Sequence, residues 1–445
     1  MALGLTPEQI IKKKTHPLLA IDEDWERIEL EEIAEVQNGY AFSSKNFNHT
    51  EGLPLIRIRD IFHKTTENLY KGKYPKEFVV ERADMLIGMD GDFKVARWQG
   101  EKALLNQRVC RVKFFSSNYD ERFMFYSLQP FLDAIHSETS AVTVKHLSSK
   151  TIKAIPLPLP PRPIQRAIVS KLEELFSSLE SGIADLKKTQ EQLKVYRQAV
   201  LKKAFEGGYF SCEISSRPLS SLSLLITKGA SPKWQGFDYV EDNEELLFVT
   251  SENVREGFIS LKKEKYLPKG FNDIQKRSIL EKGDVLFNIV GASIGRAAIF
   301  KLNKLANINQ AVALIRLNGE LNSEYLNYFL NSEIAKQEYL KNQVDVARAN
   351  LSLKNVNDIS VPYCKPEEQK KILREIESRL SVCTKIEESL EEGIGKSEVL
   401  RQSILKKAFE GKLLTQEEIE KCKKEQDYEP AELLLKRIKA KKRKK

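Results

Sequence analysis

The sequence has few of the residues that bind metals or form disulfides. Its five cysteines are Cys110, Cys212, Cys364, Cys383 and Cys422, and no two of them form a Cys-x-x-Cys pair. The five histidines all lie before residue 147, so no His/Cys cluster has the spacing of metal ligands. This pattern predicts buried or idle thiols and no metal site.

Long apolar runs are also absent. No run of eighteen apolar residues occurs, and the N-terminal stretch MALGLTPEQIIKKK lacks the apolar core of a signal peptide. We therefore expect a cytoplasmic protein. With 445 residues and 41% hydrophobic content, the chain has room for two or three domains with cores of their own.

Recognisable catalytic motifs are missing as well. The sequence contains no Gly-x-Gly-x-x-Gly fingerprint, no Asn-Pro-Pro-Phe/Tyr tetrapeptide of an adenine methylase, and no Ser/His/Asp or paired-carboxylate constellation. GIGKS at residues 393–397 lacks a phosphate loop's first glycine, because Leu390 stands in its place. We interpret GIGKS as a defect within a long helix.

Positive charge is concentrated at one end of the chain. The formal net charge is +9, and residues 436–445 carry eight basic side chains and no acid, which leaves +1 for the rest. Such a tail is either a solvated, partly disordered extension or a direct phosphate contact. If the body of the chain binds DNA, it does so through local basic patches and not through a net field.

What the sequence does contain is an internal duplication. Residues 195–207 read VYRQAVLKKAFEG and residues 399–411 read VLRQSILKKAFEG, with ten of thirteen positions identical at an offset of 204. The same offset aligns IPLPLP at 155–160 with ISVPYC at 359–364. A repeat of this length indicates two copies of one unit.

Each duplicated segment ends a stretch with the pattern of one long helix. Pro163 and Pro366 fit a first helical turn, and Gly207 and Gly411 fit a left-handed last position. A helix over residues 164–205 would be about 63 Å long. We expect the two helices to pair as an antiparallel coiled coil; the alternative is two amphipathic helices in separate cores. The heptad positions of the first copy are Leu172, Leu179, Leu186, Leu193 and Val200.

A globular block precedes each helix. In the first block, residues 55–61, 84–89 and 109–115 read as short strands, and residues 123–135 read as a helix. The second block repeats this order more loosely and ends in a predicted helix at 325–340. An Asn-Gln pair occurs in both blocks, at Asn106 and Asn309, and we expect it to bond a turn backbone. The two copies keep their helices while their globular blocks diverge. This suggests two domains that recognise different targets, with the helices setting the distance between them.

The predicted fold class is α+β, with two globular domains alternating with two long helices in a pseudo-two-fold repeat. The short stretch LTPEQIIKKK near the start is expected to form one or two helical turns. The expected segments are an N-terminal lead at 1–24, a first domain at 25–160, a first helix at 161–208, a second domain at 209–364, a second helix at 365–411 and a basic tail at 412–445.

Several of these motifs occur in the same order in a known family. These motifs are LEEIAEVQNGYAF, the I-x-L-P exit before each long helix, the R-Q-x-x-L-K-x-A-F-E-G helix ends and EPAELLLKRI at 429–438. Together they are spread over nearly the whole chain. In this order and duplicated, they resemble the DNA-specificity subunit of type I restriction-modification systems. The longer lead and the strongly basic end depart from that pattern.

The resemblance implies a noncatalytic subunit that reads double-stranded DNA. The two blocks would be target-recognition domains, each reading one half of a split sequence. The paired helices would set the gap and dock two methyltransferase subunits, which carry the S-adenosylmethionine; restriction (motor-nuclease) subunits complete such complexes. The chain itself would bind no cofactor. Alternatives from the residues alone are a coiled-coil scaffold that binds no DNA, and an enzyme in its own right.

Arg, Asn and Gln read base edges, whereas Lys, Arg and small hydroxyls hold phosphates. For Arg57 and Arg59 a solvated sheet face is an equal alternative, and Trp98 and Trp234 are expected to pack and not to stack on bases. Side chains of these types are the candidate DNA contacts: Arg57 and Arg59 on the predicted strand at 55–61, Thr250, Ser251 and Asn253 at the end of a predicted strand, and, in predicted turns, Lys94, Arg97, Gln99, Lys233, Gln235, Ser293 and Arg296.

The duplicated polar residues of the helix ends are candidates for partner docking, because two equal copies of a partner need two equivalent surfaces. A merely solvated helix face is the alternative. These residues are Arg197, Gln198, Lys202, Lys203, Arg401, Gln402, Lys406 and Lys407.

Overall fold

The computed structural model describes residues 5–14, 16–138, 145–210, 213–243, 245–340 and 350–442. The chain divides into two compact units. Unit 1 consists of Met1–Ala184 together with Ile394–Lys445, and unit 2 is Asp185–Gly393. None of the helices in the described ranges has the length and apolar character needed to span a bilayer.

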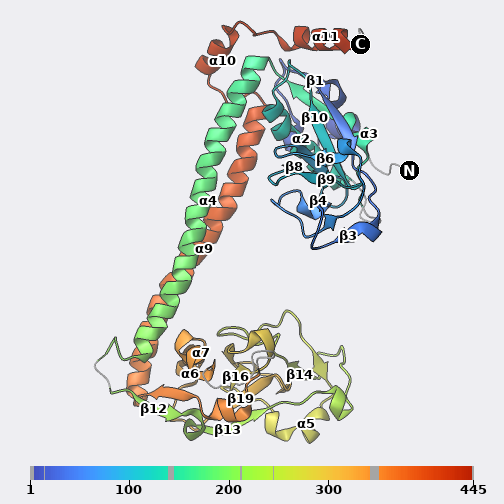
Figure 1. Ribbon diagram of the computed structural model, residues 1–445. Helices are drawn as coiled ribbons and strands as arrows, with labels where there is room; N and C mark the ends of the chain where they lie inside the picture. Colours follow the sequence, from blue (N-terminus) through green and yellow to red (C-terminus); the bar gives the residue numbers. More distant parts are fainter. Residues whose placement is uncertain are drawn as a thin grey trace. The chain divides into compact units, whose positions relative to one another are not determined.

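Two helices of 44 residues each, α4 (Arg162–Phe205) and α9 (Pro366–Phe409), contribute to both units. In unit 1 the late part of α9 packs on the early part of α4, where Arg401 pairs with Glu180 at 3.3 Å. In unit 2 the late part of α4 packs on α9, where Arg197 pairs with Glu387 at 2.8 Å. Within each unit the two helices therefore lie side by side and antiparallel, as the heptads predicted (Figure 1).

The predicted end signals of both helices are confirmed. Pro163 and Pro366 lie in the first turns, and Gly207 and Gly411 have left-handed φ values of 78° and 69°. The residue after each glycine donates its N–H to the carbonyl five positions back, at 2.8 Å and 2.7 Å. The same local sequence thus closes both helices with an equivalent hydrogen bond.

The GIGKS stretch lies inside α9, as interpreted from the sequence. Gly393 faces Leu186 of α4, and a Cβ at Gly393 would lie 3.4 Å from the leucine Cδ1. The stretch is therefore part of the helix pair and not a phosphate loop.

The globular part of unit 1 contains a two-stranded and a four-stranded antiparallel sheet. Helices α2 (Glu121–Glu138) and α3 (Ser149–Lys153) accompany them, and α2 confirms the predicted helix at 123–135. In sheet order, the strands are β1 (Glu26–Glu29) beside β11 (Pro156–Leu159), and β2 (Ala34–Asn38), β10 (Val109–Phe114), β7 (Met85–Gly88) and β8 (Val95–Arg97).

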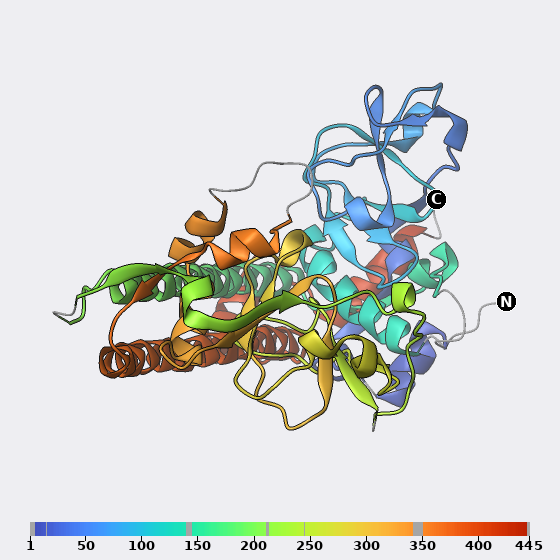
Figure 2. The same ribbon diagram turned by 90° about the horizontal axis from the view of Figure 1, so that it is seen from below.

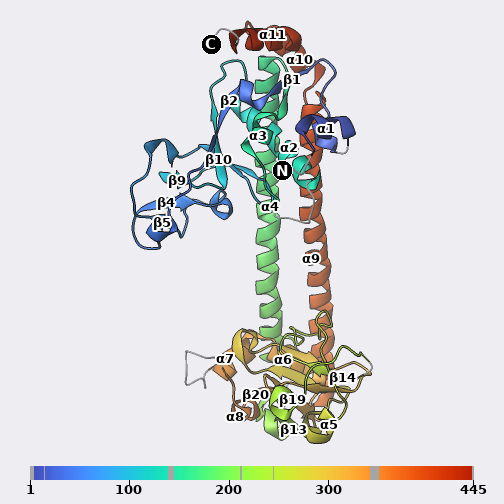
Figure 3. The same ribbon diagram turned by 90° about the vertical axis from the view of Figure 1, so that its right-hand side faces the viewer.

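A five-stranded sheet forms a lobe of its own beside them, seen in Figures 2 and 3. Its central pair is parallel, with Leu55 opposite Leu104. In sheet order, its strands are β3 (Phe47–Asn48), β5 (Leu69–Tyr70), β4 (Leu53–Ile56), β9 (Ala103–Leu105) and β6 (Val79–Val80).

The lead and the tail of the chain belong to the core of unit 1. Helix α1 (Pro7–Lys13), begun by a Thr6/Gln9 capping box, confirms the predicted helical turns of the lead. Its Ile10 shares one apolar cluster with Leu434 and Ile438 of the tail. The lead also bonds the end of α9, since Asp22 donates its backbone N–H to the Phe409 carbonyl at 3.1 Å.

The expectation of partial disorder in the basic tail is wrong over residues 436–442, which are helical, whereas Lys436, Arg437 and Lys439 are exposed, as expected of a solvated tail. The tail forms α10 (Gln416–Lys423) and α11 (Ala431–Lys442), and α11 packs on β1 (Figure 3). Arg166 of α4 holds the link between them with hydrogen bonds to Glu425 and to both oxygens of Asp427, at 2.6 Å and 2.9 Å. Leu434, just before the basic run, and Ile438, inside it, are buried on one face of the helix, which the charge count did not reveal.

Unit 2 repeats the architecture of unit 1's globular part. The order β13-β19-β16-β17 corresponds to β2-β10-β7-β8, and the three-stranded sheet β15-β14-β18 corresponds to β5-β4-β9. The strands are β12 (Ser215–Pro218) beside β20 (Ser360–Tyr363), β13 (Ser223–Lys228), β19 (Val312–Leu317), β16 (Val285–Asn288), β17 (Ala297–Ile299), β15 (Tyr266–Leu267), β14 (Leu246–Val249) and β18 (Ala306–Ile308).

The helix predicted at 325–340 is wrong in one respect, because it is two helices. Asn331 uses its side chain to bond the backbone of β17, donating to the Ala297 carbonyl and accepting from the Ala297 N–H, both at 3.0 Å. The chain breaks there and Ser332 starts a new helix. The helices of unit 2 outside the long pair are α5 (Phe271–Ile274), α6 (Ser323–Leu330), α7 (Glu333–Leu340) and α8 (Leu353–Asn357).

Candidate nucleic-acid interface

A short turn follows β4 in unit 1 and carries two of the predicted arginines. It forms the first of three walls of a surface pocket. The strand ends at Ile56, so the prediction of a strand through residue 61 is wrong. Residues 58–60 form a 3₁₀ turn, in which Asp60 accepts hydrogen bonds from the Arg57 N–H at 2.9 Å and from Thr66 at 3.0 Å. Arg57 and Arg59 therefore leave from a turn beyond the strand, and not from the face of a sheet.

The second wall of this region is the loop between β7 and β8. Gly91 there has φ 72°, and the side chain of Phe93 is buried beneath the loop. Lys94, half-buried, forms an ion pair with Asp133 of α2 at 3.0 Å. The loop thus presents Lys94 from a rigid base.

The third wall is the turn between β9 and β10. Asn106 accepts a hydrogen bond from the next residue's N–H at 2.9 Å, and Asn309 of unit 2 accepts one from Ala311 at 3.2 Å. The predicted structural duty of the two Asn-Gln pairs is confirmed for the asparagines. Gly39 lies against this turn so closely that a Cβ would be 1.9 Å from the Asn106 carbonyl oxygen.

The three walls enclose an open pocket of about 670 Å³. Four of its lining side chains are basic and two are acidic, and Phe62 at its rim is 56% exposed. Its lining comprises Arg57, Ile58, Arg59, Ile61, Phe62, Asp90, Gly91, Asp92, Phe93, Lys94, Asn106 and Arg108. A basic hollow with an exposed aromatic ring suits a nucleic acid, since phosphates and base edges need cationic donors and a base offers a face for stacking.

Three of the five candidates of the first block line this pocket, namely Arg57, Arg59 and Lys94. Arg97 does not line it: it pairs with Glu121 at 3.0 Å and its guanidinium lies over Phe125, and its DNA contact stays a prediction. Gln99 is exposed but lies outside the pocket lining.

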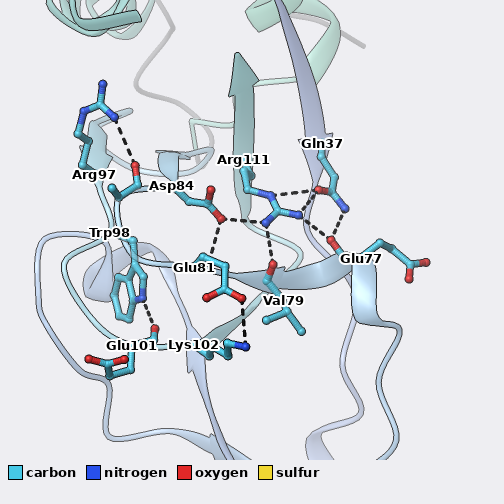
Figure 4. Close-up of polar contacts among 11 residues, drawn as sticks. Gln37, Glu77, Val79, Glu81, Asp84, Arg97, Trp98, Glu101, Lys102 and Arg111 are labelled. Atoms are coloured by element: carbon cyan, nitrogen blue, oxygen red, sulfur yellow. Dashed lines mark hydrogen bonds and ion pairs between the residues drawn. The ribbon is translucent and has the colours of Figure 1, made fainter. Parts of the chain in front are cut away.

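The β7–β8 end of the four-stranded sheet is held by polar contacts drawn in Figure 4. Trp98 is buried and donates its ring N–H to the Glu101 carbonyl at 2.6 Å, which confirms packing. Arg111 of β10 binds Asp84 at 2.8 Å and also bonds Gln37 of β2. These contacts fix the strands from which the pocket loops leave.

In the second block, two candidates prove to be structural. Thr250 and Asn253 are buried, and Asn253 accepts hydrogen bonds from the Thr250 N–H at 2.9 Å and hydroxyl at 2.8 Å. The asparagine also donates to the Ser260 and Lys263 carbonyls. All these groups are satisfied inside the turn, so both residues stabilise the turn itself, and their DNA contact stays a prediction. Ser251 between them is half-buried.

The other candidates of the second block lie at the surface. Lys233 and Gln235 lie in a 3₁₀ turn, and Trp234 between them is 86% exposed, so the expectation that this tryptophan packs is wrong. Ser293 bonds the Val290 carbonyl at 3.4 Å. The half-buried side chain of Arg296 forms no ion pair with any residue in the described ranges.

Sequence reasoning missed Arg108, Phe62 and His146. Asp90 binds His146 at 2.6 Å, and the Nε of Arg108 lies 3.4 Å from the same carboxylate. The sequence did hold a signal for Arg108, because it directly follows an Asn-Gln pair that both blocks share. No pattern pointed to His146 or Phe62.

The docking candidates divide into two classes. Arg197 binds Glu387 through two hydrogen bonds of 2.9 Å and 2.8 Å, which raise the pKa of the guanidinium. Arg401 lies 4.3 Å over the ring of Phe176. Gln198 accepts a hydrogen bond from the Glu333 N–H at 2.9 Å. These three serve contacts within the chain, whereas five candidates are exposed: Lys202, Lys203, Gln402, Lys406 and Lys407.

Metal and thiol chemistry find little support in the described ranges. One group of three potential ligands occurs there, Glu29, Glu31 and Glu32, and it consists of carboxylates alone. The four described cysteines are buried, as predicted, whereas Cys212 lies outside the described residues.

Comparison with known proteins identifies the family. The family model described as "Type I restriction modification DNA specificity domain" matches twice, at residues 22–188 and 229–396. The chain is 34% identical to the type I restriction enzyme EcoBI specificity subunit of Escherichia coli, over 99% of this chain and 97% of that one. It is 22% identical to the MjaVIII specificity subunit of Methanocaldococcus jannaschii, over 84% and 91%.

Two solved structures share the fold. One, from a study of complex assembly and conformational transition of the type I R-M system, has a TM-score of 0.67 at 17% identity, over 88% of this chain and 100% of that chain. The HsdS subunit from Thermoanaerobacter tengcongensis has a TM-score of 0.50 at 16% identity, over 88% and 98%. The duplicated α+β domains, the paired long helices and both matches of the family model place this chain in the type I restriction-modification DNA specificity family.

Proposed function

We propose that this chain is the target-recognition subunit of a type I restriction-modification complex and reads a two-part sequence in double-stranded DNA. The observation that carries the proposal is the repeat itself. Two domains share a backbone framework down to individual turns, yet differ in the side chains that line the turns. One domain reading one half-site and its divergent copy reading another accounts for both facts. The relatives give no support to a scaffold that binds no DNA.

The long helices are the proposed docking surface for methyltransferase subunits. Val195 and Val399 are each 71% exposed, and Lys202 and Lys406 follow seven positions later on the same helix face. Packing of the helix pair does not require identity at exposed positions. An exposed apolar residue and an exposed lysine repeated in both copies fit two copies of one partner, each bound to an equivalent surface.

The chain is proposed to be noncatalytic and cytoplasmic, and to bind no cofactor itself. The methylation chemistry and its S-adenosylmethionine would belong to the docked methyltransferase subunits, and restriction subunits would join them where a nuclease activity exists. The absence of an adenine-methylase tetrapeptide from the sequence supports this division of labour.

The test is a genome-wide map of methylated adenines in cells that express the chain with its methyltransferase subunit. A two-part motif with a fixed gap is expected. Four-residue insertions at matched points of α4 and α9 should then lengthen the gap by one or two base pairs, because they add about 6 Å of helix. Both half-sites should stay unchanged. A soluble complex that methylates DNA without any motif would overturn the proposal.

A further inference from the structure

The turn that carries Arg57 in unit 1 has a counterpart of the same geometry in unit 2. Asp60 accepts the Arg57 N–H at 2.9 Å, and Asn253 accepts the Thr250 N–H at 2.9 Å. In both units the turn follows a strand that pairs parallel to the next sheet neighbour. This alignment places Arg57 opposite Thr250 and Arg59 opposite Glu252.

The second wall of the pocket also has its counterpart. Gly88 donates its N–H to the Lys94 carbonyl at 3.0 Å, and Asn288 donates to the Arg296 carbonyl at 2.9 Å. Lys94 and Arg296 therefore occupy equivalent positions, and both are basic.

The β-bridge made by the loop of the second wall and the turn of the third wall correspond as well. Asp90 forms a β-bridge with His146, and Val290 forms the equivalent bridge with Asn350. The two aligned asparagines of the Asn-Gln pairs place Arg108 opposite Ala311.

The two domains thus share the hydrogen-bonded framework of these turns and one basic position, and they differ at five of the other aligned positions. The residues of unit 1 at those five positions are Arg57, Arg59, Asp90, Arg108 and His146; those of unit 2 are Thr250, Glu252, Val290, Ala311 and Asn350. A contact to phosphate carries no sequence information, so both readers need the same one. A contact to a base edge must differ between two readers of different half-sites.

We propose that Arg57, Arg59 and Arg108 read base edges of the half-site bound by unit 1, and that Lys94 and Arg296 hold equivalent phosphates in the two half-sites. The assignment rests on the proposed function and adds the specificity-determining residues. Arginine pairs best with the two acceptors of guanine, so the unit 1 half-site contains a G·C pair at each position that these residues read.

Arg108 is positioned for this task by its neighbours. Its side chain is 53% exposed, its Nε lies 3.4 Å from Asp90, and its Nη1 lies 3.4 Å from Nδ1 of His146, which binds Asp90 at 2.6 Å. Asp90 itself is largely covered.

The experiment compares adenine-methylation maps of complexes carrying Arg57→Ala, Arg59→Ala or Arg108→Ala. Each variant should relax one position of one half-site, with a loss of discrimination of about 5- to 150-fold at that base pair. The other half-site and the gap should stay unchanged. Lys102→Ala is the matched control, because Lys102 is exposed in the same unit but lies outside the pocket.

A variant whose methylation disappears is assayed for binding, with the purified complex and duplexes altered in one half-site at a time. Loss of discrimination confined to one half-site supports the proposal. Wild-type motifs in all three arginine variants, or relaxation at a position without a G·C pair, overturn it. Such results leave the proposed function intact, because that function fails only if the unmodified complex has no two-part motif.

Variants of Lys94 and Arg296, the proposed phosphate contacts, should give a different result from the arginine variants. Lys94→Ala and Arg296→Ala should each weaken binding to all duplexes and lower the slope of log K against log salt by about 1. The methylated motif should not change. A change of motif in either variant would overturn the phosphate assignment.

Discussion

Gln165 and Gln369 make the same buried hydrogen bonds in the first turns of the two long helices, 204 positions apart. Gln165 accepts the Asp120 N–H and donates to the Pro160 carbonyl, both at 2.7 Å. Gln369 accepts the Asn322 N–H at 2.8 Å and donates to the Cys364 carbonyl at 2.8 Å. Each glutamine therefore ties a long helix to the start of the domain helix that follows β10 or β19, namely α2 or α6.

Replacing either glutamine by alanine should destabilise its own unit by about 1–3 kcal/mol, because a buried N–H and a buried carbonyl lose their partner. Urea denaturation followed with a probe in each unit measures the change. Gln402→Ala is the control, since Gln402 is exposed and should alter stability by less than about 0.5 kcal/mol. Equal effects of all three substitutions would contradict the expectation.

Alanine substitutions at four glycines should change the free energy of unfolding in opposite directions. At Gly39 and Gly229 a Cβ would lie 1.9 Å and 1.7 Å from a backbone carbonyl oxygen, so alanine must push the chain apart and destabilise it. Gly182 and Gly395 lie inside the long helices with nothing within 4 Å of a Cβ. Alanine there should stabilise by about 0.5–1 kcal/mol. Thermal unfolding of the four variants tests both signs, and destabilisation by all four would refute the helix assignment.

On the proposed docking surface, Val195→Glu and Val399→Glu should each remove one methyltransferase copy from the complex, and the double variant should remove both. A glutamate at the centre of an apolar contact must be desolvated on binding, whereas in the free chain it stays in water. Native mass spectrometry of the co-purified complex counts the copies. Val382→Glu is the control, because Val382 is 55% exposed on α9 and its counterpart is Ser178. Unchanged stoichiometry in the double variant would exclude this face.

Burial raises the pKa of the Cys110 thiol to about 12. In the unfolded chain the thiol has a pKa of about 8.5. The contribution of the protonated, buried thiol to stability is therefore complete below that pH and is lost as the pH rises toward 12. At pH 9 iodoacetamide should label Cys110 only in unfolded molecules, which peptide mass spectrometry measures with and without urea. Labelling of the folded protein at the rate of a free thiol would show that the side chain is accessible.

The sequence predicted the parts of the fold whose signals are periodic or repeated. Heptad leucines, the two prolines and the two terminal glycines defined α4 and α9, because helix geometry is set by local spacing. The turn at residues 57–61 was misjudged because alternating Ile and Arg suit a strand, while the deciding contact is made by the Asp60 carboxylate. The break at Asn331 likewise depends on a bond to β17, a tertiary contact with no local pattern.

The candidate site was predicted in part for the same reason. Arg57 and Arg59, predicted on a strand, and Lys94, predicted in a turn, have the right chemistry and line the pocket. Thr250 and Asn253 have equally suitable chemistry, but their polar groups are hydrogen-bonded within their own turn. Arg108 follows the Asn-Gln pair that both blocks share, so the sequence could have pointed to it, but only the structure shows that it lines the pocket.

The shared core of the lead, the first domain and α10–α11 has a consequence for synthesis of the chain on the ribosome. Unit 2 is one continuous stretch, so all its parts are available once Gly393 has emerged. Unit 1 is made first but waits for partners that are translated last, including Phe409, Leu434 and Ile438. The second reader is therefore complete before the first, and a premature stop after residue 393 damages the domain at the opposite end of the message.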